Sequence, residues 1–305
     1  MHIKGTILVL MSAVCFSLVS VMTKIGYKLG FTPLRIIFLE KLIASAIILP
    51  LLFCFQRQCI YLGWRRLKQI LLLGLFGTVI SSLAFYTALQ YLDAAVATIL
   101  LFTNPIVVLL LNVIINRKPF SPIQVGSLVT CLLGGVLVLD LLDLSSLSIS
   151  SLGITLGFIA SIGLGFFTFY AQRILDAGVH PLSIIFYNNL LILCVVFLLV
   201  LVFDSNFALG DISLKMWGLV VVLALISSIL PNIFSLRGIE LIGATRTSLV
   251  STFELPCSVF FTFLFLGERL APVQLLGALL VLLGVALVQL DKDRLLIFLP
   301  KNFAE

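Results

Sequence analysis

The strongest constraint on the fold is a succession of long apolar segments that occupy almost the whole chain. A helix needs about 20 apolar residues to cross the hydrocarbon core of a bilayer. The segments that meet this length are residues 5–27, 33–54, 68–90, 95–115, 121–140, 151–173, 181–203, 213–236, 244–266 and 272–290. Their connections are short. The pattern predicts an all-α integral membrane protein with ten transmembrane helices.

Composition agrees with this fold class. Hydrophobic residues make up 61% of the chain and charged residues 10%, whereas soluble domains contain about 25% charged residues. The net charge of +6 needs no nucleic acid as a partner, because an excess of Lys and Arg is typical of cytoplasmic loops. The N-terminal apolar segment is interpreted as the first membrane helix and not as a cleaved signal peptide. The expected partner of most of the surface is therefore the lipid bilayer.

The distribution of positive charge predicts the orientation. Lys and Arg concentrate at alternate ends of the segments, as in Arg65, Arg66 and Lys68 before the third segment and Arg117 after the fourth. The positive-inside rule then places both termini in the cytoplasm, and an even number of helices requires the two termini to share a side. The expected location is the inner cell membrane.

The two halves of the chain repeat. Residues 30–38 and 178–186 are identical at six of nine positions, 148 residues apart, and Pro105 and Gly134 have counterparts in Pro256 and Gly284. We predict a first five-helix repeat over 1–145, a second over 146–292 and a cytoplasmic tail over 293–305. An odd number of helices in each unit makes the second repeat inverted. Such repeats place a site near the membrane midplane, between the halves.

One family resemblance rests on motifs of the second half. These are Glu254-Leu-Pro256, Phe265-Leu-Gly-Glu268-Arg269 and Gln274-Leu-Leu-Gly277. Together with the ten-segment repeat, they resemble the EamA-type members of the drug/metabolite transporter superfamily. The resemblance implies export of a small organic metabolite such as an amino acid by alternating access, through a cavity lined by helices one, three, four, six, eight and nine. Glu254 aligns with Thr103, and Glu268 aligns with Lys118, so the charges break the internal symmetry.

Glu254 is the leading candidate for function. Ten residues from the start of its segment, at 1.5 Å per residue, place it about 15 Å deep, near the bilayer centre. A carboxyl group there is costly and usually faces a cavity or a partner. It could bind a substrate amine or carry a coupling proton. The alternative is a neutral glutamic acid that bonds to carbonyl groups freed by Pro256.

The remaining candidates are polar or aromatic residues inside apolar segments. Ser12, Phe16, Ser20 and Lys24 recur at a spacing of four, which places them on one helix face. Glu40 and Lys41 lie about ten Å into the second helix, and Lys24 would reach Glu40 if the first two helices pack together. The other candidates for substrate contact are Ser82, Tyr86, Thr103, Asn104, Tyr170, Gln172, Ser228 and Asn232. Helix–helix contacts, ion pairing and snorkelling to the interface are the structural alternatives for these residues.

The function best supported by these patterns is that of a secondary transporter for a small-molecule substrate, with protons as the candidate coupling ion. A membrane-embedded enzyme and a channel are the alternatives. The chain contains no HExxH, GxSxG or GxxxxGK[ST] motif, so catalytic residues and nucleotide-driven pumping are not expected. With two histidines and with six cysteines mostly inside apolar segments, neither a metal site nor a cofactor is expected. The expected oligomeric state is a monomer or a homodimer.

Overall fold

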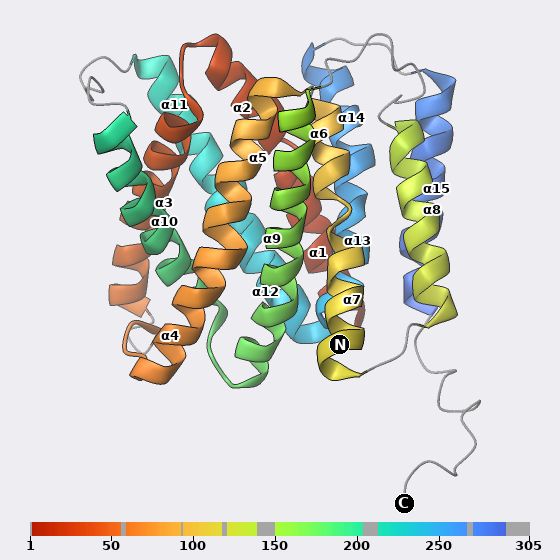
Figure 1. The fold of residues 1–305 in the computed structure, drawn as a ribbon, viewed down its shortest axis with the longest axis horizontal. Coiled ribbons are helices and arrows are strands. Elements are labelled where there is room, and N and C mark those ends of the chain that lie inside the picture. The colour runs from red at the N-terminus through yellow and green to blue at the C-terminus, as the bar shows by residue number, and fades with distance from the viewer. Residues whose placement is uncertain are drawn as a thin grey trace, which may run out of the picture.

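The computed structural model describes residues 2–55, 59–92, 94–117, 121–138, 150–203, 213–266 and 271–290. The regular structure in these ranges is helical, in agreement with the predicted fold class (Figure 1). Within these described ranges, seven helices are long and apolar enough to cross a membrane, and Pro122–Val138 and Pro272–Leu287 are shorter apolar helices. The predicted Glu268–Arg269 motif, its counterpart Lys118 and the predicted tail 293–305 lie outside the described residues.

The first half of the chain contains a series of helical elements, some of them directly continuous. They are α1 (His2–Phe16), α2 (Val19–Lys28), α3 (Pro33–Phe55), α4 (Trp64–Leu73), the π-helical turn η2 (Gly74–Val79), α5 (Ile80–Tyr91), α6 (Ala94–Leu101), α7 (Asn104–Asn116) and α8 (Pro122–Val138).

The second half repeats this order, except that its first helix is unbroken. The elements are α9 (Ser151–Asp176), α10 (Pro181–Phe203), α11 (Leu214–Leu223), the π-helical turn η5 (Ala224–Ile229), α12 (Leu230–Ile242), α13 (Ala244–Val250), the 3₁₀ turn η6 (Ser251–Phe253), α14 (Glu254–Leu266) and α15 (Pro272–Leu290). The two π-helical turns are 150 residues apart and each interrupts a long helix at the same point. Short π-helical segments inside α-helices frequently mark functional sites.

Matched turns join α2 to α3 in the first half and α9 to α10 in the second half. Gly30 and Gly178 follow α2 and α9 with φ angles of 92° and 81°, a left-handed conformation that is costly for residues with a Cβ atom. Proline then opens the next helix in both halves, as Pro33 and Pro181. Proline is favoured there because the first helical N–H needs no intrahelical partner. The sequence repeat over these residues therefore encodes a repeated turn.

Prolines also coincide with helix breaks inside the bundle. Pro105 removes the N–H that would bond to the Leu101 carbonyl, and the Asn104 side-chain amide bonds to that carbonyl instead, at 3.0 Å. Pro231 has the same effect on the Ser227 carbonyl, which accepts from the Asn232 amide at 2.8 Å. The sequence predicted a weakened turn at Pro105 and at Pro256, and breaks occur between α6 and α7 and at η6.

The first apolar segment is divided, which its sequence did not predict. Helix α1 ends at Phe16 and α2 begins at Val19. The Ser17 hydroxyl donates to the Val14 carbonyl at 2.6 Å, and the backbone N–H of Leu18 bonds three residues back, to Cys15. Such local bonds compete with the regular helix ladder. The predicted continuous face with a spacing of four is therefore interrupted after Phe16.

The helices form one bundle with an outlying pair, α8 and α15, which lie side by side (Figure 1). This pair is in backbone contact: a Cβ atom added to Gly277 would lie 2.4 Å from the Val138 nitrogen, and one on Gly134 would lie 2.7 Å from the Val281 nitrogen. Close approach through glycine is typical of membrane helices. Large apolar side chains such as Leu133 and Leu279 are exposed on the outer surface, which suits contact with lipid tails.

Candidate functional site

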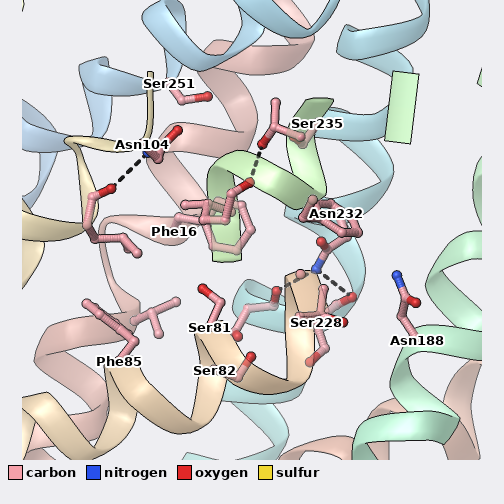
Figure 2. A pocket seen from close by; sticks show the side chains of 18 of the residues that line it. Phe16, Ser81, Ser82, Phe85, Asn104, Asn188, Ser228, Asn232, Ser235 and Ser251 are labelled. Carbon is pink, nitrogen blue, oxygen red and sulfur yellow. Dashed lines mark hydrogen bonds between the residues drawn. The ribbon is translucent and has the colours of Figure 1, made fainter. Parts of the chain in front are cut away.

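A cavity with a volume of about 190 Å³ lies inside the bundle, and both halves of the chain line it (Figure 2). A water molecule occupies about 30 Å³ in the liquid, so the cavity has room for several waters or one small organic solute. Its wall combines aromatic side chains such as Phe16 and Phe85 with hydroxyl and amide groups such as Ser82 and Asn104. Apolar walls with a few polar groups are typical of small-molecule sites.

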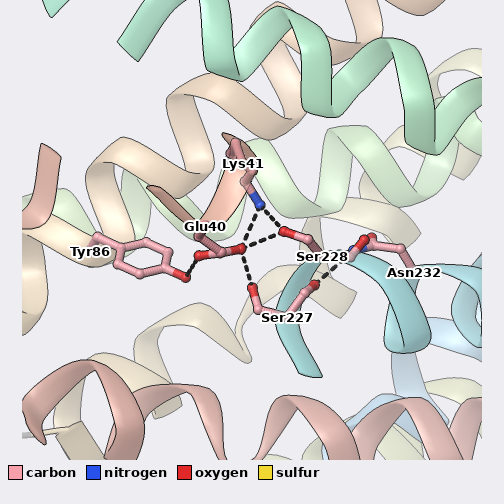
Figure 3. Close-up of polar contacts among 6 residues, drawn as sticks. All are labelled: Glu40, Lys41, Tyr86, Ser227, Ser228 and Asn232. Atoms are coloured by element: carbon pink, nitrogen blue, oxygen red, sulfur yellow. Dashed lines mark hydrogen bonds and ion pairs between the residues drawn. The ribbon is translucent and has the colours of Figure 1, made fainter. Parts of the chain in front are cut away.

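A buried polar network lies at one side of the cavity, centred on Glu40 of α3 (Figure 3). Glu40 is fully buried. Its Oε1 atom accepts from the Lys41 ammonium at 2.8 Å, from Ser227 at 2.9 Å and from Ser228, and its Oε2 atom accepts from the Tyr86 hydroxyl at 2.6 Å. Charged groups inside the membrane are tolerated when they are paired in this way.

Lys41 joins the network to the cavity. Its ammonium group bonds to Glu40 and, at 2.6 Å, to the Ser228 hydroxyl, and Lys41 also lines the cavity. Adjacent helical residues need not pair, but these two do. The network connects α3 of the first half with η5 of the second half, so it ties the two repeats together next to the cavity.

Glu254 lines the cavity from the first position of α14, directly after the turn η6. It is partly buried, and its carboxyl group makes no hydrogen bond or ion pair within the described part of the chain. Thr247 and Ser251 precede it by seven and three residues and line the same cavity, as expected for one face of a helix. Glu254 thus forms part of the wall around the space that a solute would fill, and its carboxyl group has no bond to any described residue.

The structure brings about half of the predicted site residues to the cavity wall. These are Phe16, Lys41, Ser82, Tyr86, Asn104, Ser228, Asn232 and Glu254. Glu40 is not among the lining residues but is bonded to four of them, Lys41, Tyr86, Ser227 and Ser228.

The other predicted residues make contacts elsewhere. The Ser12 hydroxyl donates to the Pro231 carbonyl, Lys24 donates to the Leu92 carbonyl, and the Thr103 hydroxyl is bonded to that of Ser161. Gln172 accepts from the backbone N–H of Ala244 at 2.8 Å, at the start of α13. Tyr170 packs between Phe166 and Phe169. Nothing is described of the Ser20 side chain.

Sequence reasoning missed part of the cavity wall. The family resemblance implied six lining helices, but α3 contributes as well, through the predicted residue Lys41. Helix α10 also contributes, through Asn188 and Asn189, which were not among the candidates. The signal for α10 was available, because Asn188 and Asn189 stand 148 residues after Glu40 and Lys41. Helices α8 and α15 contribute no lining residue, which agrees with their outlying position.

A second cluster of polar side chains lies at the turn before α10. The ring of His180 contacts the Arg237 guanidinium at 2.9 Å, and Arg237 forms an ion pair with Glu240 at 2.7 Å. Partial burial, and then the charge of Arg237, hold the pKa of His180 below its ordinary value of 6.5. This group is separate from the cavity. Among the described residues, no cluster of His, Cys, Asp and Glu could hold a metal ion.

These features define a multi-pass helical membrane protein built around a central polar cavity. The pattern of the EamA-like transporter family matches residues 3–140 and 151–290, one copy in each half. The chain therefore belongs to the EamA-like transporter family, as its motifs predicted, and it is a membrane transporter in contact with lipid.

Relatives and solved structures agree with this assignment. The chain is 26% identical to the uncharacterized transporter YcbK of Bacillus subtilis over 283 residues, which cover 90% of this chain and 88% of the relative. It is 27% identical to the uncharacterized inner membrane transporter YicL of Salmonella typhimurium over 235 residues, 74% of each chain. A crystal structure with 14% sequence identity superimposes with a TM-score of 0.77 over 97% of this chain and 99% of the other, which supports the fold alone.

Proposed function

We propose that this protein is a secondary transporter that exports a small organic metabolite of the amino-acid type by alternating access, with protons as the candidate coupling ion. In this proposal, ten transmembrane helices form two inverted five-helix repeats, over 1–145 and 146–292, and both termini lie on the cytoplasmic side of the membrane. The protein acts as a monomer or a homodimer. The class of substrate and the direction of transport are parts of this proposal.

The observation that carries the proposal is that Glu254, whose carboxyl group has no bond to any described residue, lines the same cavity as Lys41. An amino acid carries an ammonium and a carboxylate group, and each end can find an opposite charge on this wall. Lys41 already bonds to Glu40 and Ser228, but an ammonium group has three donors, so one remains for a substrate carboxylate. Apolar surface from Phe16 and Phe85 suits the rest of a small metabolite.

The repeated architecture supports alternating access. Helix breaks and π-helical turns recur about 150 residues apart and border the cavity on both sides, through Gly77 and Thr78 of η2 and Ser227 and Ser228 of η5. In transporters with inverted repeats, one half rocks against the other around a fixed site near the midplane. Breaks placed beside the cavity provide the points at which such helices can bend.

Flux into proteoliposomes tests the role of Glu254. We expect purified protein to transport labelled amino acids or related amines, selected from a binding screen by thermal shift, and a pH gradient to accelerate the flux. The Glu254→Gln variant keeps the size and polarity of the side chain but loses the carboxyl group that can bind or release a proton. It should lower substrate flux at least tenfold and abolish the effect of the pH gradient.

The matched control is Glu240→Gln, because Glu240 is a solvent-exposed glutamate paired with Arg237 outside the cavity. It should keep wild-type flux. Full transport by Glu254→Gln with an unchanged response to pH would refute the coupling role.

A further inference from the structure

The two repeats place different polar pairs at equivalent positions beside the cavity. Glu40 and Lys41 lie on α3, and Asn188 and Asn189 follow 148 residues later on the equivalent helix α10. Both helices open with the repeated proline turn, so the register of the two pairs is the same. Helix α3 packs against η5, and α10 packs against η2. The internal symmetry thus creates two comparable niches beside the cavity. The charged niche surrounds Glu40 and Lys41, and the neutral niche surrounds Asn188 and Asn189.

The charged niche is satisfied by the protein itself. Glu40 accepts four hydrogen bonds, from Lys41, Tyr86, Ser227 and Ser228. The hydroxyl groups of Ser227 and Ser228 come from η5, the π-helical turn that faces α3 (Figure 3). Three of these bonds go to Oε1 and one goes to Oε2, and the residue is fully buried. A solute would have to displace a protein group to bond to Glu40.

The neutral niche is not satisfied. The Oδ1 atom of Asn188 is buried without a hydrogen-bond partner in the described part of the chain, although the residue is only 5% exposed and lines the cavity (Figure 2). A Cβ atom on Gly74 of η2 would lie 2.6 Å from this oxygen. The equivalent residue of η5 is Ala224. Glycine in η2 therefore leaves the room that the Asn188 amide occupies. The Thr78 hydroxyl of η2, at the position equivalent to Ser228, donates to the Gly74 carbonyl at 2.8 Å.

A buried polar atom without a partner is destabilising, and native proteins contain few of them. One common reason for keeping such an atom is that a ligand supplies the missing bond. An amide can also turn by 180° about its last torsion and exchange its oxygen for its NH₂ group. In the structure Oδ1 packs toward Gly74 of η2, but no bond to a described residue holds it there. By turning, the Asn188 amide can present either its oxygen or its NH₂ group to the cavity.

We propose that Asn188 is the residue that selects the substrate, by hydrogen bonding to an uncharged hydroxyl or carboxamide group of the transported solute. The neutral amide of Asn188 cannot compensate the charge of a charged solute group. A hydroxyl or carboxamide group of the solute can both donate and accept, so it can form a hydrogen bond with Asn188 in either orientation of the amide. This inference rests on the proposed transport function and adds the polar end of the substrate to it. The charged groups of the solute are assigned to Glu254 and Lys41.

The first test needs no substrate. Replacing Asn188 by Leu, which has a similar shape, removes the unsatisfied oxygen, so the melting temperature of the purified protein should rise by about 2 °C or more. Asn232→Leu is the matched control. The Asn232 amide donates to the carbonyl groups of Ser227 and Ser228, so its removal should lower the melting temperature. Asn188→Ala provides a smaller replacement if the leucine is not accommodated. An Asn188 variant that melts clearly below the wild type in both forms would overturn the inference.

The second test uses solutes of similar shape that differ in one polar group. Wild-type proteoliposomes should transport L-asparagine at least tenfold better than L-leucine, and L-threonine better than L-valine, because a site built for a hydrogen bond discriminates strongly against the apolar analogue. Asn188→Leu should remove both preferences. Flux without any such preference in the wild type, or a preference that survives in Asn188→Leu, would overturn the inference and leave the transport function intact. Absence of flux with every amino acid would contradict the proposed function itself.

Discussion

At the residue scale, the cavity separates groups that hold the protein together from groups that are open to a solute. Glu40 is enclosed by four donors, whereas Glu254 faces the cavity with no bond to any residue the structure describes. The sequence identified both carboxyl groups as costly, but it could not assign these different roles. The difference depends on Ser227 and Ser228, which are 187 and 188 residues away from Glu40 in the chain. Ser228 was a candidate for substrate contact, but nothing in the sequence placed either serine against Glu40.

Lys41→Met tests the structural role of the Glu40 network. The change removes the charge partner and leaves the Glu40 carboxylate buried, so we expect it to destabilise the protein by about 3–5 kcal/mol. The double variant Glu40→Gln with Lys41→Met removes both charges and should recover a large part of that loss. Thermal melting in detergent measures both effects. Additive losses in the double variant would contradict the assignment of the two residues as a pair.

His180 gives stability a defined pH dependence. Its pKa is lower in the folded protein than the ordinary value of 6.5 because of burial and the charge of Arg237. Below pH 6.5 the unfolded chain binds a proton at His180 that the folded protein resists, so stability decreases as the pH falls from 6.5 toward the folded-state pKa, and His180 contributes no such dependence above pH 7. Melting temperatures between pH 7.5 and 5.5 should fall less steeply in His180→Gln than in the wild type. Identical slopes would contradict this account.

At the element scale, the helix breaks and the outlying pair perform different tasks. Breaks at Phe102–Thr103, at η6 and in the two π-helical turns border the cavity, while α8 and α15 lie outside it. Prolines indicated two of these breaks in the sequence. Pro231 also stands two residues after η5, but the break after Phe16 and the turn η2 had no comparable signal, because they depend on side-chain bonds and packing rather than on a missing N–H group.

The crossing of α8 and α15 requires glycine at position 277. A Cβ atom there would lie 2.4 Å from the backbone nitrogen of Val138 and 2.7 Å from the Gly134 oxygen, and backbone atoms cannot move aside as a flexible side chain can. Gly277→Ala should therefore destabilise the protein by about 1–3 kcal/mol. The matched control is Gly126→Ala on α8, where an added Cβ meets nothing within 4 Å and should stabilise the helix slightly. Equal melting temperatures for the two variants would show that the crossing is not close.

At the scale of the whole molecule, the apolar segments and the repeat predicted most of the fold from the sequence. Membrane helices are encoded locally, by about 20 apolar residues each, and the turns at Gly30 and Gly178 are encoded by the same short motif. The cavity was predicted less completely. Whether Ser12 or Ser82 faces it depends on the rotation and packing of helices, and small polar residues serve both kinds of contact.

Counterflow in proteoliposomes tests the central claim most directly, because alternating access, a channel and an enzyme give different results. Vesicles that contain the protein are preloaded with an unlabelled amino acid that the protein binds, and are diluted into a trace of the same labelled compound. An alternating-access transporter exchanges one for the other, so the label should accumulate transiently above its equilibrium level inside the vesicles. Glu254→Gln vesicles should show no such overshoot. Simple equilibration of the label without an overshoot in the wild type would indicate a channel, and chemical conversion of the label without uptake would indicate an enzyme; either result would contradict this account.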